Sequence, residues 1–188
     1  MKGESLWQSK LAERIRGRFL FDEEVHVKLE EYAFHMGSLM ANFQSLEFSL
    51  RAFLQNQPDA RPIGIPYGQD VYATLIGEEI AESELSSYDS LGELIKKYNE
   101  TAEERGLTKV DPTLVDVRDA LAHGRISAPI EGAHMRLIKY SRPKNGRVTV
   151  TFNAVLSEDW FRTEKGRAVG ALMSVAKSQS DSRRDTEI

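Results

Sequence analysis

The feature that most constrains the fold is an apolar stripe with heptad spacing between residues 25 and 53. The stripe alternates steps of four and three residues through Val25, Leu29, Tyr32, Met36, Leu39, Phe43, Leu46, Leu50 and Phe53. Because this spacing keeps every position on one face of an α-helix, it predicts one long helix that packs along other helices. Met40, Phe48 and Leu54 widen the stripe, which favours a helical bundle over a two-stranded seam.

The ends of the long helix are marked by capping residues. Asp22 is an expected N-cap, because Glu23 and Glu24 follow it in the first turn, where the helix dipole favours acids. The helix must end before Pro58. A short helix is predicted upstream at residues 5–19.

The next segments alternate between loop and helix. Residues 57–69 are rich in proline and glycine and predict a loop, and residues 70–86 are expected to contain a helical piece. Ser90 and Glu93 form a capping box that opens a helix ending at Gly106. Asp111 followed by Pro112 predicts the start of a further helix that ends at Gly124.

The C-terminal third changes its periodicity. Residues 135–140 and 148–152 predict two strands, and Asn145-Gly146 between them is typical of a hairpin turn. Ser157 is the expected N-cap of a last helix over residues 158–177. The polar residues from Ser178 onward predict a disordered tail.

Together these elements predict a mainly α fold with three parts. Residues 1–128 would form a helical bundle. Residues 129–177 would add a β-hairpin and a C-terminal helix packed on that bundle, and residues 178–188 would be the tail. The amino-acid composition is that of a globular domain, with 40% hydrophobic and 29% charged residues.

Cysteine content and hydropathy bound the classes of site that the chain can carry. The chain has no cysteine, which excludes disulfides and zinc–thiolate sites and fits a reducing cytoplasm. No apolar run approaches the roughly 20 residues of a membrane span, so we expect no membrane partner. We also expect no cofactor, because no glycine-rich phosphate loop, serine-nucleophile motif or zinc pattern is present.

Charge is distributed unevenly along the chain. Residues 1–117 hold 12 Lys and Arg against 21 Asp and Glu, whereas residues 118–188 hold 13 against 8. A basic C-terminal third is suited to a polyanionic partner, although the same asymmetry is common among helical proteins.

The change of sign falls on a short polar segment inside an apolar helix, Arg118-Asp119-Ala120-Leu121-Ala122-His123-Gly124. On a helical wheel, Arg118 falls in the middle of an arc formed by Leu114, Val115, Val117, Leu121 and Ala122. A guanidinium there is costly unless it is paired or reaches a polar cavity. Arg118 therefore needs an explanation, and two are available.

In the structural explanation Arg118 pairs with an acid of the long helix, for which Glu47 is the candidate, while His123 makes a local hydrogen bond. In the functional explanation Arg118 binds a phosphate and His123 acts as general acid or base. Residues five apart on one helix diverge by about 140°. Both could reach one phosphate if the terminal turn relaxes or if a second subunit completes the site.

The segment 118–124 resembles the Arg-polar-x-x-x-His motif of the HEPN superfamily in its R-[N/D]-x-L-A-H-G form. The similarity extends over about residues 22–126. It includes a long earlier helix with an acidic residue, Glu47, and a motif near the end of the last bundle helix.

The resemblance implies a homodimer whose two motifs meet in a cleft. It also implies metal-independent endoribonuclease activity of the kind found in toxin–antitoxin, phage-defence, CRISPR and stress systems. Arg118 would stabilise the phosphorane, His123 would be the general acid or base, Asp119 the polar partner and Glu47 a supporting residue. The RNA's own 2′-hydroxyl would attack the phosphate.

Two departures from the family pattern are visible. The motif continues His123-Gly124-Arg125, so the tyrosine that is nucleotidylated in one toxin branch is missing. Asp119 replaces the commoner asparagine.

Partners and alternatives follow from the same resemblance. A cognate antitoxin or another protein partner fits the toxin–antitoxin reading. The alternative function is a non-catalytic dimeric interaction or nucleotide-binding module, since some HEPN domains are inactive.

Other candidate sites depend on charge and on histidine spacing. Arg125 and the hairpin residues Arg136, Lys139, Arg142, Lys144 and Arg147 are candidate RNA contacts, although a solvated hairpin face explains them equally well. His26 with Glu30 and Glu31 with His35 have the i,i+4 spacing of bundle metal ligands. No matching ligands occur on the other expected helices, so we predict no metal site.

Overall fold

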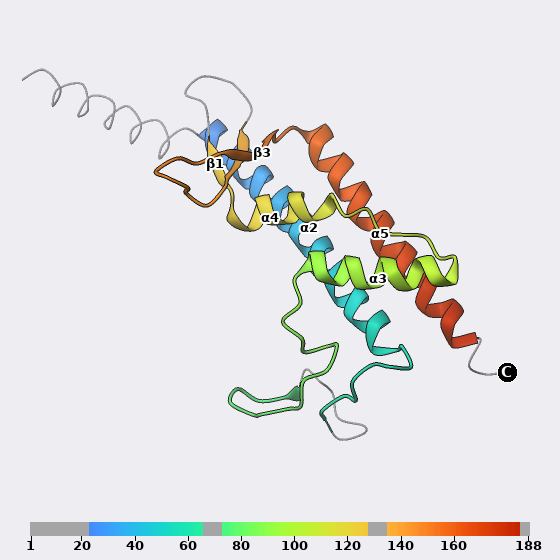
Figure 1. Cartoon of the computed structure of the whole chain (residues 1–188). Coiled ribbons are helices and arrows are strands. Elements are labelled where there is room, and N and C mark those ends of the chain that lie inside the picture. Colours follow the sequence, from blue (N-terminus) through green and yellow to red (C-terminus); the bar gives the residue numbers. More distant parts are fainter. Residues whose placement is uncertain (1–22, 66–72, 128–134, 185–188) are drawn as a thin grey trace, which may run out of the picture. The chain divides into compact units, whose positions relative to one another are not determined.

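The computed structural model describes residues 23–65, 73–127 and 135–184 (Figure 1). Its elements in chain order are α2 (Glu23–Gln55), α3 (Leu91–Arg105), α4 (Leu114–His123), β1 (Arg125–Ser127), β2 (Arg136–Tyr140), β3 (Val150–Val155) and α5 (Glu158–Arg184). The fold is therefore mainly α, as predicted. The chain divides into two compact units, residues 1–38 and 39–188, with the boundary inside α2. The candidate functional residues belong to the second unit.

The heptad stripe forms the centre of the core of the second unit. Five of its residues in α2 are at most 1% exposed: Leu39, Phe43, Leu46, Leu50 and Phe53. This confirms the prediction for that part of the helix, and α2 ends at Gln55, before Pro58. Phe48 was wrongly assigned to the stripe, because it is half exposed. It follows Leu46 by two residues, which turns it about 200° around the helix. The predicted N-cap Asp22 and the predicted helix at 5–19 lie outside the described residues.

Helix α3 begins and ends as its sequence predicts. The Ser90 hydroxyl accepts a hydrogen bond from the Glu93 backbone N–H at 3.4 Å, and the Glu93 carboxylate accepts one from the Ser90 N–H at 2.8 Å. Gly106 closes the helix in the left-handed conformation, with φ 66°. The buried ring of Tyr98 meets that of Phe53 on α2 edge-on, with centroids 4.8 Å apart. Local caps thus bound the helix, and aromatic packing holds it against α2.

Residues 73–86 contain no α-helix, so the helical piece predicted at 70–86 is wrong for that part. The segment is tied to its surroundings by side chains instead. Gln55 Oε1 on α2 accepts a hydrogen bond from the Glu84 backbone N–H at 3.1 Å, and just beyond the segment Arg51 donates to the Ser87 and Asp89 carbonyls at 2.8 and 2.7 Å. Arg61 forms ion pairs with Glu82 and Glu84. Because these partners lie far away in the sequence, a local helical pattern could not report them.

Helix α4 begins at Leu114, three residues after the predicted N-cap Asp111. Asp111 instead closes a tight turn, in which its carboxylate accepts hydrogen bonds from the Thr113 N–H and hydroxyl at 2.9 and 2.8 Å. Its other carboxylate oxygen accepts a hydrogen bond from Arg167 on α5 at 2.8 Å. The predicted start is therefore displaced by a turn that ties α4 to α5.

Helix α5 begins after Ser157, whose hydroxyl accepts a hydrogen bond from the Trp160 N–H at 3.1 Å as predicted for an N-cap. The helix continues to Arg184, so the disordered tail predicted from Ser178 is wrong for residues 178–184. Ser178 is buried and its hydroxyl lies 3.1 Å from that of Tyr98. Gln179 donates to the Ser49 carbonyl on α2 at 2.8 Å. These contacts extend the helix beyond its apolar part.

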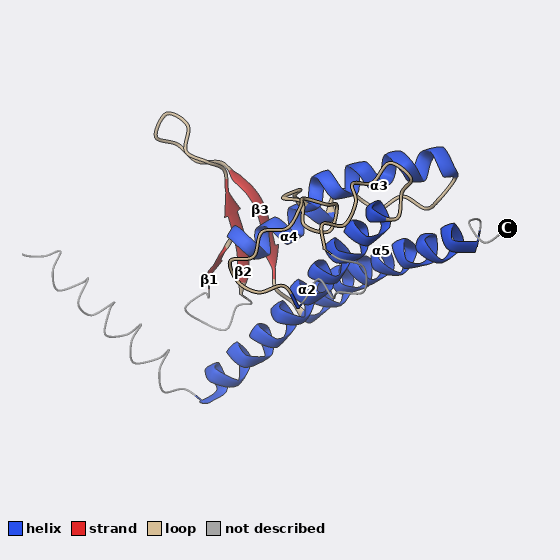
Figure 2. Cartoon of the chain, turned by 90° about the horizontal axis from the view of Figure 1, so that it is seen from below, coloured by secondary structure: helices blue, strands red, loops and turns tan. Residues whose placement is uncertain are grey.

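The three strands form one antiparallel sheet in the order β1-β2-β3. The hairpin between β2 and β3 turns at Asn145 and Gly146, which have φ 52° and 71°, as the predicted Asn-Gly turn requires. β3 starts at Val150, two residues later than expected, and its register with β2 shifts between Lys139 and Tyr140. β1 was not predicted. Figures 1 and 2 show α4 lying between this sheet and α3.

In the described part of the chain, none of the helices has both the length and the apolar character needed to cross a bilayer.

Candidate functional site

The buried face of α4 is formed by Leu114, Val117 and Ala120. Its centre therefore lies near Val117, about 100° from Arg118, and Ala122 is exposed. The prediction that Arg118 stands in the middle of the apolar arc is thus wrong. Arg118 lies at the border of the buried face with 27% of its side chain exposed, and there it can meet both protein and solvent.

The Arg118 guanidinium is held by a carboxylate from α2. Its Nε donates to Glu47 Oε1 at 3.0 Å, across 71 residues of sequence. The Glu47 side chain is 21% exposed, so the pair is partly screened by solvent and its contribution to stability is modest. The ion pair that the sequence suggested between these residues is confirmed.

Asp119 links the arginine to the sheet. Its Oδ1 accepts a hydrogen bond from Arg118 Nη1 at 3.2 Å, and its Oδ2 accepts one from Lys139 Nζ on β2 at 3.3 Å. Glu47, Arg118, Asp119 and Lys139 thus form a chain of alternating charges that joins α2, α4 and β2 and has no net charge. The acid that the sequence placed beside the phosphate is therefore neutralised by Lys139.

His123 is the last residue of α4, and its side chain is exposed. Within the described residues it makes no hydrogen bond, so the local bond of the structural explanation is not observed there. The side chain is available to a ligand or to a second subunit. On the helical wheel it still diverges from Arg118 by about 140°.

Gly124 ends α4, as predicted, but not through a left-handed backbone, because its φ is −75°. Glycine is needed for space instead. A Cβ atom at this position would lie 2.3 Å from the Ala120 carbonyl oxygen and 2.7 Å from Leu137 Cδ1. The missing side chain therefore lets β2 pass directly against the end of the helix.

The geometry leaves Arg118 one nitrogen for a ligand. Nε and Nη1 are engaged by Glu47 and Asp119, while Nη2 makes no hydrogen bond within the described residues. An anion that approached Nη2 would also approach the charge network that Arg118 forms with Glu47, Asp119 and Lys139. The arrangement can therefore hold the guanidinium in place by its two carboxylates while Nη2 faces a phosphate oxygen.

The predicted RNA-contacting residues separate into three groups. Arg125 and Arg136 lie exposed on β1 and β2, and Lys139 is turned toward Asp119. The other three, Arg142, Lys144 and Arg147, lie in the hairpin loop.

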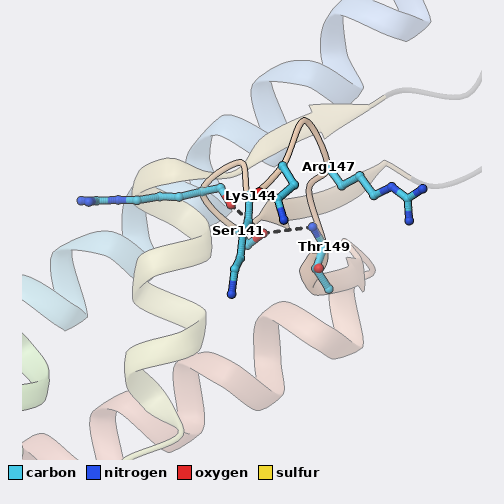
Figure 3. Close-up of a pocket in the computed structure, with 6 residues that line it drawn as sticks. Ser141, Lys144, Arg147 and Thr149 are labelled. Carbon is cyan, nitrogen blue, oxygen red and sulfur yellow. Dashed lines mark hydrogen bonds between the residues drawn. The ribbon is translucent and has the colours of Figure 1, made fainter.

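The hairpin loop surrounds an open hollow of about 660 Å³ lined by Ser141, Arg142, Lys144, Asn145, Arg147 and Thr149 (Figure 3). Ser141 fixes the neck of the loop, because its hydroxyl accepts a hydrogen bond from the Thr149 N–H at 3.0 Å. Figure 3 shows Arg147 extending outward from the loop. The hollow lies at the hairpin and not at Arg118.

Sequence reasoning missed Tyr140 and Asn153, which share a face of the sheet with Arg125 and Arg136. The alternation in residues 136–140 could have placed Arg136 and Tyr140 together. The strand β1 has only three residues and shows no such alternation, so the sequence could not place Arg125 on this face.

Among the described side chains, no group of three or more histidine, aspartate or glutamate residues is arranged to hold a metal ion. The side chain of His26, one of the histidines with bundle-ligand spacing, lies outside them.

Comparisons of the chain with protein-family models, curated proteins and solved structures gave no match. The HEPN resemblance therefore depends on the residues of the motif and on their setting.

Proposed function

We propose that the protein is a metal-independent endoribonuclease of the HEPN type that acts as a homodimer. The observation that carries the proposal is the position of two side chains on α4. Arg118 is oriented by Glu47 and Asp119 with Nη2 left for a ligand, and His123 is exposed at the end of the same helix.

The roles follow from the chemistry of the side chains. Arg118 would stabilise the charge that develops on the phosphorane, and a preoriented donor does so without reorganisation. His123 would transfer protons between the RNA 2′-hydroxyl and the leaving oxygen. Since the two side chains diverge on one helix, the second subunit would bring its own histidine or arginine to the same phosphate.

A second candidate is a non-catalytic dimeric interaction or nucleotide-binding module. It is favoured by the two carboxylates on Arg118, which lie 3.0 and 3.2 Å from its nitrogens. An arginine already neutralised in this way can serve to join α2 to α4 rather than to bind phosphate.

The deciding experiment measures cleavage of a panel of single-stranded RNAs in EDTA by the wild type and by His123→Ala. The histidine variant should keep its melting temperature, because the exposed side chain makes no hydrogen bond within the described residues. Its cleavage rate should fall about 10²- to 10⁴-fold. Arg118→Lys, which keeps the charge but loses the planar fork, should also cleave slowly.

Matched controls separate catalysis from general damage. Arg162→Ala removes an exposed arginine of α5 whose partners among the described residues, Glu158 and Asp159, belong to its own helix, and it should cleave as the wild type does. Undiminished cleavage by His123→Ala would refute the proposal. Absence of cleavage by the wild type over the whole panel would favour the non-catalytic module.

A further inference from the structure

The register of the sheet separates its side chains into two faces. On β2, Leu137 and Lys139 point toward α4, since Leu137 is buried against Gly124 and Lys139 reaches Asp119. Arg136, Ile138 and Tyr140 therefore occupy the opposite face, because successive side chains of a strand alternate. The pairing Arg125↔Ile138↔Asn153 places Arg125 and Asn153 on this opposite face too.

The opposite face contains an aromatic ring with a guanidinium over one side of it. The Arg125 guanidinium carbon lies 5.6 Å from the centroid of the Tyr140 ring. The Tyr140 side chain remains 39% exposed, and Arg136 is held by Asn153 at 3.1 Å. A partly exposed ring that a guanidinium covers on one side only leaves its other side as a stacking surface next to positive charge.

The charged residues of the described strands and of the hairpin loop are all basic. Residues 135–157 contain Arg136, Lys139, Arg142, Lys144 and Arg147 and no acid, and β1 carries Arg125 and no acid. The only carboxylate contact of these cations in the described residues is Lys139 with Asp119, on the other face. The exposed face is therefore complementary to a polyanion that also presents flat rings, and a single-stranded nucleic acid has both properties.

We propose that the face of the sheet formed by Arg125, Arg136, Tyr140 and Asn153 binds single-stranded RNA. One base would stack on Tyr140, while Arg125 and Arg136 contact the flanking phosphates and Asn153 holds Arg136 in place. The choice of RNA rests on the proposed function, since stacking by itself accepts any base. β1 begins at Arg125, two residues after His123, so the Cα atoms of this platform arginine and of the proposed catalytic histidine are at most about 7 Å apart.

The test is fluorescence anisotropy with a labelled 12-nucleotide, fully 2′-O-methylated oligouridylate in EDTA, which the protein cannot cleave by 2′-hydroxyl attack. The wild type should bind, and Tyr140→Ala should weaken binding about 5- to 150-fold, while Tyr140→Trp should retain it. Arg125→Gln and Arg136→Gln should each lower the slope of log Kd against log salt concentration by about 0.7.

Two matched controls come from exposed residues elsewhere. Tyr88→Ala removes a fully exposed tyrosine from the loop before α3, and Arg162→Gln removes an exposed arginine from α5. Both should bind as the wild type does. Circular dichroism should show that the Tyr140 variants remain folded.

The proposal is overturned if the wild type does not bind the oligouridylate or if Tyr140→Ala binds within twofold of it. It is also overturned if Tyr88→Ala loses as much affinity, or if phosphatidylserine vesicles compete for the face as well as RNA does. If the wild type binds but cleaves no RNA, only the proposed ribonuclease activity is refuted. If Tyr140→Ala binds and cleaves as the wild type does, only the proposed RNA binding by this face is refuted.

Discussion

Replacing Gly124 by alanine should destabilise the fold by about 2 kcal/mol. The new Cβ would lie 2.3 Å from the Ala120 carbonyl oxygen, 2.7 Å from Leu137 Cδ1 and 3.2 Å from the Ile138 carbonyl oxygen. Leu137 can rotate, but the two carbonyl oxygens belong to α4 and β2 and can move only with their elements. Overpacking of this kind costs about 1 to 3 kcal/mol, and we expect the upper end because backbone must shift.

Part of this cost is offset in the unfolded chain. With φ −75° and ψ 176°, the backbone at Gly124 is one that alanine adopts readily, so the substitution also lowers the entropy of the unfolded state. That effect stabilises by about 0.4 to 1 kcal/mol and leaves a net loss of about 2 kcal/mol. For a chain of this length the melting temperature should fall by about 4 to 8 °C.

The assay is thermal and urea unfolding followed by circular dichroism, with Gly170→Ala as the matched control. Gly170 lies within α5, and apart from the backbone of its own helix no atom of the described residues lies within 4 Å of an added Cβ there. Alanine should therefore stabilise that helix by about 1 kcal/mol. If Gly124→Ala proves as stable as the wild type, the close approach of β2 to the end of α4 is not what requires glycine.

Three other changes test the local structure. Ser90→Ala should cost about 1 kcal/mol in urea unfolding because the capping box is lost, and Ser45→Ala, whose exposed hydroxyl donates to the Ala41 carbonyl inside α2, serves as the non-capping comparison. Gly146→Ala should cost about 1 to 2 kcal/mol, since φ is 71° there; an unchanged urea midpoint would contradict the left-handed turn. Hydrogen bonds from Thr113, together with Arg167, hold the pKa of Asp111 below its usual range. As the pH falls, the Asp111 carboxylate is therefore protonated in the unfolded chain at a higher pH than in the folded chain. The stability contributed by Asp111 is present above about pH 4 and is lost as the pH falls further. In Asp111→Asn the free energy of unfolding should fall less steeply below about pH 4. A fall as steep as that of the wild type would refute this role of Asp111.

Features that depend on neighbouring residues could be predicted from the sequence. The Ser90–Glu93 capping box, the Asn145-Gly146 turn and the Ser157 cap are hydrogen-bonded or conformational units of a few residues. Their residue types therefore identify them directly. The buried heptad positions of α2 belong to the same class, because the period of the helix decides which face they share.

The structure that two polar segments take from distant residues was predicted wrongly. Residues 73–86 were expected to be helical, yet side chains of α2 and of the preceding loop hold them. Residues 178–184 were expected to be disordered, yet Ser178 and Gln179 bind α3 and α2. In each case a polar segment is held by residues that are far away in the sequence, so a pattern of neighbouring residues does not reveal them.

The candidate site combines both kinds of information. The sequence by itself determined that Arg118, Asp119 and His123 lie on one helix that ends at Gly124, because helical periodicity and a stop residue are local properties. Only the tertiary structure decided that Glu47 and Lys139 complete the charge network. It also decided that Arg118 lies at the border of the buried face, and that Tyr140 joins Arg125 on the exposed face of the sheet. The reason is physical: a side chain's partner is set by which elements pack together, and that depends on the whole core.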